Sequence, residues 1–169
     1  IKHFDLNYIG LDMNVERGGN NQKKFILKPK GSNYSSFELR HASSGIQTTA
    51  PLIAMMNYYA QAFDFKLAQK RSIIDLLFEK NLTTQYRPEM ELTDMPKYVH
   101  IHIEEPELSL DPTSQIQMLN EIIRLAFYSK VDSREIGLVL ATHSPYIINS
   151  LNLLMKAHDC KTDIDGAHV

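Results

Sequence analysis

The stretch Tyr98–Pro112, YVHIHIEEPELSLDP, decides the fold of this 169-residue chain. Its first half alternates β-branched and polar side chains with a period of two, which predicts a strand that ends at two carboxylates, Glu104 and Glu105. In open α/β sheets ligands bind beyond the carboxyl ends of the strands, so an acidic pair there is placed for chemistry. Because successive strand residues point to opposite faces, we expect the two carboxylates to diverge and to have separate roles.

The residues that follow predict a helix and a second strand. Asp111-Pro112 is a favourable helix start, since proline suits the first helical position. The apolar stripe of that helix comprises Ile116, Leu119, Ile122, Ile123, Ala126 and Phe127. The run Ile136–Ala141, IGLVLA, is continuously apolar and predicts a strand buried on both faces. A strand, a helix and a strand of this length imply a right-handed parallel crossover, which brings both strand ends to one edge of the sheet. His143, just past the second strand and before another amphipathic helix, should therefore lie beside Glu104 and Glu105.

The residues before this stretch predict an antiparallel sheet and then a helix. Residues 1–42 carry short period-two runs separated by probable turn sequences at 18–21 and 30–33, so we expect a β-rich segment. At Ser43–Gln47, SSGIQ, the pattern changes to helical spacing. The free amides of a helix N-terminus can bind an anion, and Ser and Gly let a phosphate approach the backbone. An ordinary helix cap that involves Ser44 is the alternative.

Composition sets broad limits on the class of protein. A formal net charge of -2 and a pI near 6.4 give no basic surface from which nucleic-acid binding could be inferred. The single Cys160 cannot form an internal disulfide, and no apolar run approaches the length of a membrane span, so we expect a cytoplasmic location. The chain begins at Ile1 with a strand-like pattern, and we expect it to be part of a longer protein.

The segment Ser43–Gln47 resembles the signature motif of ABC-type ATPases, in the form found in the OLD-like (overcoming lysogenisation defect) family. The resemblance implies that Ser44, Gly45 and Gln47 contact ATP bound by a partner head. The resemblance extends from this segment to about Asn152.

The acidic strand end resembles the Walker B segment of the same family. Glu104, where the family usually has Asp, would hold Mg²⁺ through its water shell, and Glu105 would act as general base. Leu108–Asp111 would form the D-loop, which implies that Asp111 also lies near ATP. The sequence THSP around His143 resembles the switch-histidine motif, which implies contact with the γ-phosphate.

The fold class that this resemblance implies is α/β: the C-terminal lobe of a P-loop NTPase, with parallel strands flanked by helices and an antiparallel N-terminal segment. We expect one partial domain over residues 1–169, divided into a β-rich segment (1–42), a signature helix and connector (43–97), a catalytic core (98–157) and a tail (158–169). No G-x-x-x-x-G-K-[ST] loop occurs, so an N-terminal lobe with the Walker A loop would have to be supplied as a partner. The expected protein hydrolyses ATP, forms a homodimer around it, and serves DNA repair or anti-phage defence, with any DNA contact made by other domains.

Two other functions remain open at this stage. His100, His102 and Glu104 share one face of the predicted strand and could bind a metal ion in a hydrolase. Alternatively, the chain could be a catalytically inactive scaffold for dimerisation.

Overall fold

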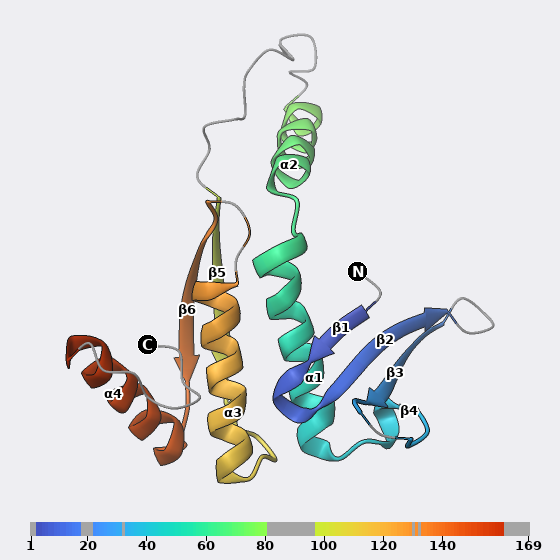
Figure 1. Cartoon of the computed structure of the whole chain (residues 1–169). Helices are drawn as coiled ribbons and strands as arrows, with labels where there is room; N and C mark the ends of the chain where they lie inside the picture. The colour runs from blue at the N-terminus through green and yellow to red at the C-terminus, as the bar shows by residue number, and fades with distance from the viewer. Residues whose placement is uncertain are drawn as a thin grey trace.

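Two β-sheets enclose a layer of helices in the computed structural model, which describes residues 3–17, 22–31, 33–80, 97–129, 131 and 133–160. Figure 1 shows an antiparallel sheet on one side of helices α1 and α3, and strands β5 and β6 on the other. Apolar side chains from all these elements form one buried core. The chain is therefore a mixed α/β structure, as the sequence predicts.

The N-terminal sheet consists, within the described residues, of four strands in sequential order. They are β1 (His3–Leu6), β2 (Leu11–Arg17), β3 (Lys23–Pro29) and β4 (Phe37–Glu38). All neighbouring pairs are antiparallel, which confirms the predicted β-rich segment. The alternation of the strands places Leu6, Met13 and Leu27 against the helices, and all three side chains are almost completely buried. The turn predicted at 18–21 lies outside the described residues. In the turn predicted at 30–33, Gly31 has a φ of 64°, a conformation that favours glycine.

Helices α1 (Ser44–Asn57) and α3 (Pro112–Ile123) form the middle layer. Each continues into a π-helical turn, η4 (Tyr58–Ala62) and η7 (Arg124–Tyr128) respectively. The fully buried large side chains of this layer are Ile53, Met56, Met118, Leu119, Ile122 and Leu125. The predicted stripe of α3 is therefore rotated: Ile116 and Phe127 are exposed, and Met118 and Leu125 take part in the core instead.

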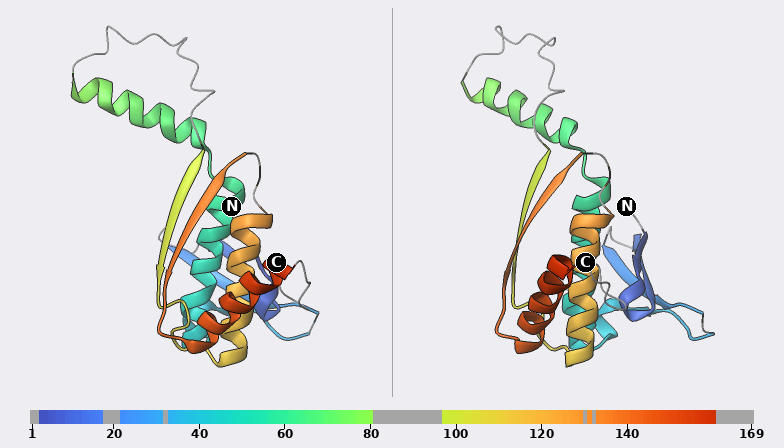
Figure 2. Two further views of the ribbon diagram at one scale, coloured as in Figure 1. Left: turned by 90° about the vertical axis from the view of Figure 1, so that its left-hand side faces the viewer. Right: turned by 60° about the vertical axis from the view of Figure 1, so that its left-hand side comes forward.

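Strands β5 (Tyr98–Glu104) and β6 (Glu135–Ala141) pair in parallel, and α3 lies between them in the sequence. Figure 2 shows α1, α3 and α4 (Pro145–Cys160) all on one side of this sheet. Ile101, Ile103 and Ile136 face the helices and are buried.

The other face of this sheet is not covered by the described residues. Tyr98, His100, His102 and Glu104 alternate along its exposed side, and Val139 is 50% exposed. The expectation that Ile136–Ala141 is buried on both faces is therefore wrong for this chain. Parallel sheets in folded proteins are usually covered on both faces, so the exposure of this face among the described residues is unusual.

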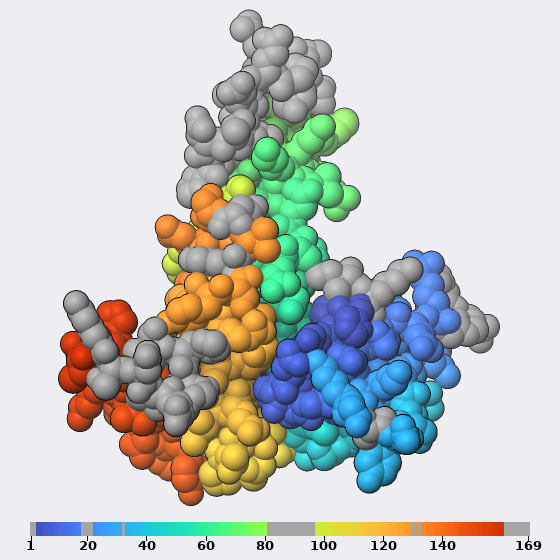
Figure 3. Space-filling view, in the orientation of Figure 1, coloured from blue at the N-terminus to red at the C-terminus, as the bar shows by residue number. Residues whose placement is uncertain are grey.

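Helix α2 (Phe65–Glu79) projects from the body (Figure 3). Its base is held by the buried Arg134, which precedes β6. The guanidinium donates to the carbonyl oxygens of Tyr59 (2.7 Å) and Val131 (2.9 Å), and its carbon lies 5.2 Å from the centre of the Phe65 ring. One side chain thus joins the end of α1, the start of α2 and the start of β6. None of the helices in the described ranges is long and apolar enough to cross a membrane.

Candidate functional site

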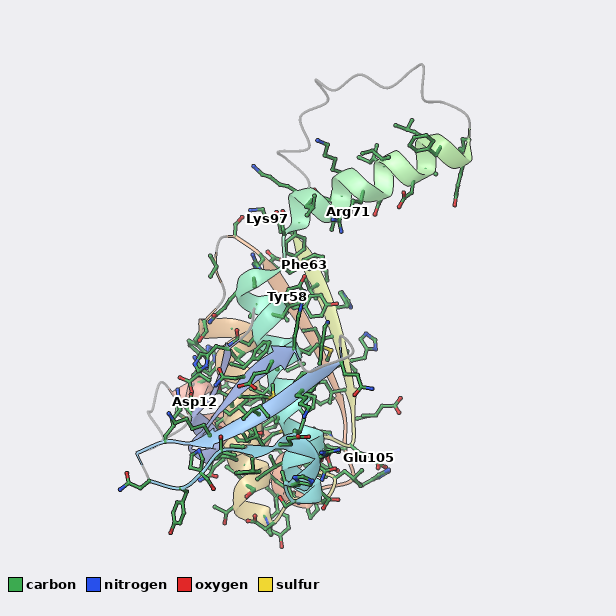
Figure 4. All side chains as sticks on the ribbon, turned by 90° about the vertical axis from the view of Figure 1, so that its right-hand side faces the viewer. Asp12, Tyr58, Phe63, Arg71, Lys97 and Glu105 are labelled. Carbon is green, nitrogen blue, oxygen red and sulfur yellow. The ribbon has the colours of Figure 1, made fainter. Side chains whose placement is uncertain are left out.

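The acidic pair lies at the carboxyl end of β5, at the opposite end of the molecule from the joint between α1 and α2. Figure 4 shows Glu105 there, far from Tyr58 and Phe63 at the joint. Glu104 is the last residue of β5 and is exposed. Glu105 then leaves the strand with a φ of 44°, while its amide donates to the Ala141 carbonyl oxygen at 2.8 Å. A non-glycine residue in this region is strained, and such strain is concentrated at functional sites.

His143 lies next to this kink, as the parallel crossover predicts. Its Nε2 atom is 3.5 Å from Glu105 Oε1, and the two side chains are 89% and 52% exposed. The two residues are brought together because each follows the end of one of two paired parallel strands. No contact of His143 with Glu104 is seen among the described residues, so only one carboxylate of the pair meets the imidazole.

Glu107 connects the two strand ends. One carboxylate oxygen, Oε1, accepts hydrogen bonds from the Thr142 hydroxyl (2.7 Å) and from the amides of His143 (2.8 Å) and Ser144 (3.1 Å). Burial raises the pKa of Glu107, but these hydrogen bonds outweigh burial and bring its pKa below the usual value. Sequence reasoning did not assign this residue to the site. Its position in EEPE gave no signal of partners 35 to 37 residues away.

Ser144 fixes the start of α4 from the other side. Its hydroxyl accepts from the amides of Tyr146 (3.2 Å) and Ile147 (3.3 Å), which is the geometry of a helix cap. The same hydroxyl donates to the buried side-chain oxygen of Gln115 on α3. The chain on either side of His143 is therefore held by side-chain hydrogen bonds, whereas the imidazole itself is exposed.

The start of α1 is capped by Ser43, whose hydroxyl accepts from the Ile46 amide at 3.5 Å. The cap interpretation that involves Ser44 is therefore wrong by one residue, and Ser44 is exposed. The Gln47 side-chain amide donates to the carbonyl oxygens of Arg40 (3.1 Å) and Ala42 (2.8 Å). Gln47 thus already has partners within the chain, while Ser44 is open to a ligand.

Gly45 is buried against the loop that follows β5. A Cβ atom at this position would lie 2.7 Å from the Ser109 carbonyl oxygen and 2.7 Å from Leu110 Cδ2. The close approach that glycine permits is made here by the loop of the same chain. The predicted signature segment and the predicted D-loop are therefore in direct contact.

Asp111 acts as the N-cap of α3, as predicted for Asp111-Pro112. It accepts from the amides of Thr113 (3.0 Å) and Ser114 (3.1 Å) and from the Ser114 hydroxyl (2.5 Å). The Ser114 hydroxyl, followed by the amides, holds the pKa of Asp111 below its usual value. These contacts account for Asp111 without a ligand, and its predicted proximity to ATP stays a prediction.

An open groove of about 500 Å³ lies between the end of β5 and the first turns of α1. Its lining includes both members of the acidic pair together with Thr48, Leu52, Ile103, Pro106 and Leu108. Glu104 and Glu105 thus both border the same groove, at the end of β5 where the backbone kinks.

The structure gives no support to the metal-site hypothesis for His100, His102 and Glu104. The rings of the two histidines have centres 6.1 Å apart on the exposed side of β5. In the part of the chain that the structure describes, no three His, Cys, Asp or Glu side chains are arranged to hold a metal ion.

Comparison with protein-family models, with curated proteins and with solved structures found no match to this chain. Its class therefore follows from its own geometry: a mixed α/β protein with an antiparallel sheet, a parallel strand pair and an acidic site at the carboxyl ends of that pair.

Proposed function

We propose that this chain is the C-terminal lobe of an ABC-type ATPase head of the OLD-like kind, which completes a Mg-ATP site together with a second lobe that carries a phosphate loop. The observation that carries the proposal is the meeting of Glu105 and His143, 3.5 Å apart, at the ends of two paired parallel strands. A carboxylate and an imidazole in contact can orient a water molecule and accept its proton, as ATP hydrolysis requires.

The uncovered face of β5 and β6 supports a second lobe. Parallel sheets are normally covered on both sides, and here the helices cover one side only. A partner lobe on the free side would complete the layers and bring its own residues to the carboxyl ends of the strands. This fits the lack of a phosphate loop in the sequence.

The residues present fit Mg²⁺ bound with a nucleotide. Mg²⁺ keeps several waters and typically uses one or two protein carboxylates plus the substrate phosphates, so Glu104 at the groove is a suitable ligand. When bound, the ion would neutralise charge on the phosphates.

Glu105 and His143 would divide the proton chemistry in this mechanism. Glu105 accepts a proton from the attacking water as the bond to the γ-phosphorus forms and the bond to ADP breaks. His143, exposed and beside Glu105, orients that water and the terminal phosphate. Ser44, exposed at the start of α1, would face the nucleotide of a second head in an ATP-bound homodimer.

The test uses the polypeptide that joins this lobe to the phosphate-loop lobe. Glu105→Gln keeps the shape and removes the proton acceptor, so turnover should fall by ~10²-fold or more while ATP still binds. ATP-bound dimer should then accumulate in sedimentation experiments. Glu135→Gln is the matched control, because Glu135 is an exposed carboxylate at the other end of the same sheet and should leave turnover unchanged. Normal turnover by Glu105→Gln would contradict the proposal and would favour the inactive-scaffold alternative or a different base.

A further inference from the structure

The turn that carries His143 is held by one carboxylate from the neighbouring strand end. Glu107 Oε1 accepts hydrogen bonds from the Thr142 hydroxyl and from the amides of His143 and Ser144, all within 3.1 Å. The Ser144 amide also approaches the Thr142 hydroxyl at 3.0 Å. Three consecutive residues, Thr142 to Ser144, therefore donate to a single oxygen atom.

The imidazole has little else to fix it. The side chain is 89% exposed, and among the described residues its imidazole approaches Glu105 at 3.5 Å. Packing therefore does little to hold the ring in place, and the backbone at Thr142–Ser144 sets the region that the ring can reach. Whatever fixes that backbone keeps Glu105 within reach of His143.

The hydrogen bonds of Glu107 are concentrated on one of its two carboxylate oxygens. Oε2 is buried and has no hydrogen-bond partner among the described residues. The side chain therefore acts through the three contacts of Oε1, which an amide oxygen at the same place could also accept. The loop that carries Glu107 is also strained, with Glu105 at a φ of 44° and Ser109 at 63°.

We propose that Glu107 is a positioning residue, which holds the Thr142–Ser144 turn so that His143 stays beside Glu105. This inference rests on the proposed function, because positioning matters only if Glu105 and His143 act together. Glu107 itself does not touch the reacting atoms. It acts through the backbone of its neighbours across the two strand ends.

The first test needs no nucleotide and uses the 169-residue chain. In NMR spectra, Glu105→Gln should shift the ring resonances of His143, because the two side chains are in contact. In a Glu107→Ala background, the same Glu105→Gln change should shift them by less than half as much, and the His143 and Ser144 amides should exchange faster with solvent. An undiminished response to Glu105→Gln in the Glu107→Ala background would overturn the positioning role, whatever the activity of the protein.

Further variants separate positioning from stability. Thr142→Val removes one of the three hydrogen bonds to Glu107, together with the contact from the Ser144 amide, with little change of shape. It should weaken the response of His143 to Glu105→Gln even if Glu107→Ala fails to fold. Glu107→Gln should restore the response, since an amide oxygen can accept the same bonds. If Glu107→Gln weakens the response of the His143 resonances to Glu105→Gln as much as Glu107→Ala does, the argument from hydrogen-bond geometry is overturned. Glu79→Ala, at the exposed end of α2, is the control that should change nothing.

The second test measures turnover in the two-lobe polypeptide. Glu107→Ala should lower kcat by ~10- to ~10²-fold with KM for ATP nearly unchanged, because misplacement affects the transition state more than binding. Glu107→Gln should recover most of kcat. A loss confined to KM would overturn the positioning role. Absence of ATP hydrolysis by the unsubstituted polypeptide would instead refute the proposed function and leave the NMR result standing.

Discussion

The contact between α1 and the loop after β5 makes a specific prediction for Gly45. Replacement by alanine places a Cβ atom 2.7 Å from the Ser109 carbonyl oxygen and from Leu110 Cδ2. Ordinary contacts of this kind are about 3.5–4.0 Å, so the loop or the helix must move. The Leu110 side chain can rotate away, but the Ser109 carbonyl belongs to a backbone that already has a φ of 63°.

The expected net effect is a loss of stability. Forcing extra volume into a packed site costs about 1–3 kcal/mol. Replacement of a helical glycine by alanine raises the free energy of unfolding by about 0.5–1 kcal/mol. The gain is smaller near the first turn, where Gly45 lies. Since the obstructing atom is a backbone oxygen, we expect Gly45→Ala to lower the free energy of unfolding by about 1–2 kcal/mol, or Tm by roughly 2–8 °C for a chain of this size.

Gly137→Ala provides a matched control. A Cβ atom at Gly137, in β6, would meet the hydroxyl end of Tyr98, which is exposed and can swing aside. Its free energy of unfolding should therefore be unchanged or higher by up to about 1 kcal/mol, since alanine restricts the unfolded chain. Urea denaturation of the two variants and the parent chain measures both effects. A Gly45→Ala protein as stable as the parent, or more stable, would refute the tight contact between the start of α1 and the loop.

Three other substitutions or measurements test separate features. Ser43→Ala should lower the unfolding free energy by about 0.5–2 kcal/mol in urea denaturation, whereas Ser44→Ala should stay within about 0.5 kcal/mol; equal losses would place the cap elsewhere. The pKa of Asp111 is lowered in the folded chain, so its ionised form stabilises the fold above about pH 4, and this contribution is lost as pH falls through the folded pKa. The difference in unfolding free energy between the parent and Asp111→Asn, which keeps a capping oxygen, should therefore shrink from pH 7 to pH 3, and a constant difference would argue against ionised Asp111. Calorimetry of this chain alone with Mg-ATP should show weaker than micromolar binding, because no phosphate loop is present, and micromolar affinity would contradict the two-lobe proposal.

Local patterns predicted the elements that carry the site. Period-two alternation identified β5, and the Asp111-Pro112 start identified α3 with its capping residue in the correct place. The parallel crossover then predicted the approach of His143 to Glu105, since topology alone brings the ends of such strands together. These predictions succeeded because each depends on periodicity, a capping residue or chain direction, which neighbouring residues determine.

Features that depend on contacts between distant segments could not be predicted. The three donors of Glu107 lie 35 to 37 residues beyond it, and nothing in their sequence marks the pairing. Gly45 and Ser109 are still farther apart in the sequence, so the pattern at Gly45 predicted a phosphate contact rather than this contact within the chain. The metal hypothesis was based on one face of one strand, and the described residues contain no group of three His, Cys, Asp or Glu side chains arranged to hold an ion.

The buried Arg134 links the projecting helix to the parallel sheet. Its guanidinium donates to carbonyl oxygens of Tyr59 and Val131 and lies against the ring of Phe65, so this side chain adds to the backbone in holding the base of α2. Arg134 is itself the residue that precedes β6. The far end of that strand is the residue whose carbonyl oxygen binds the Glu105 amide. The root of α2 and the kinked carboxylate are thus connected along the length of a single strand.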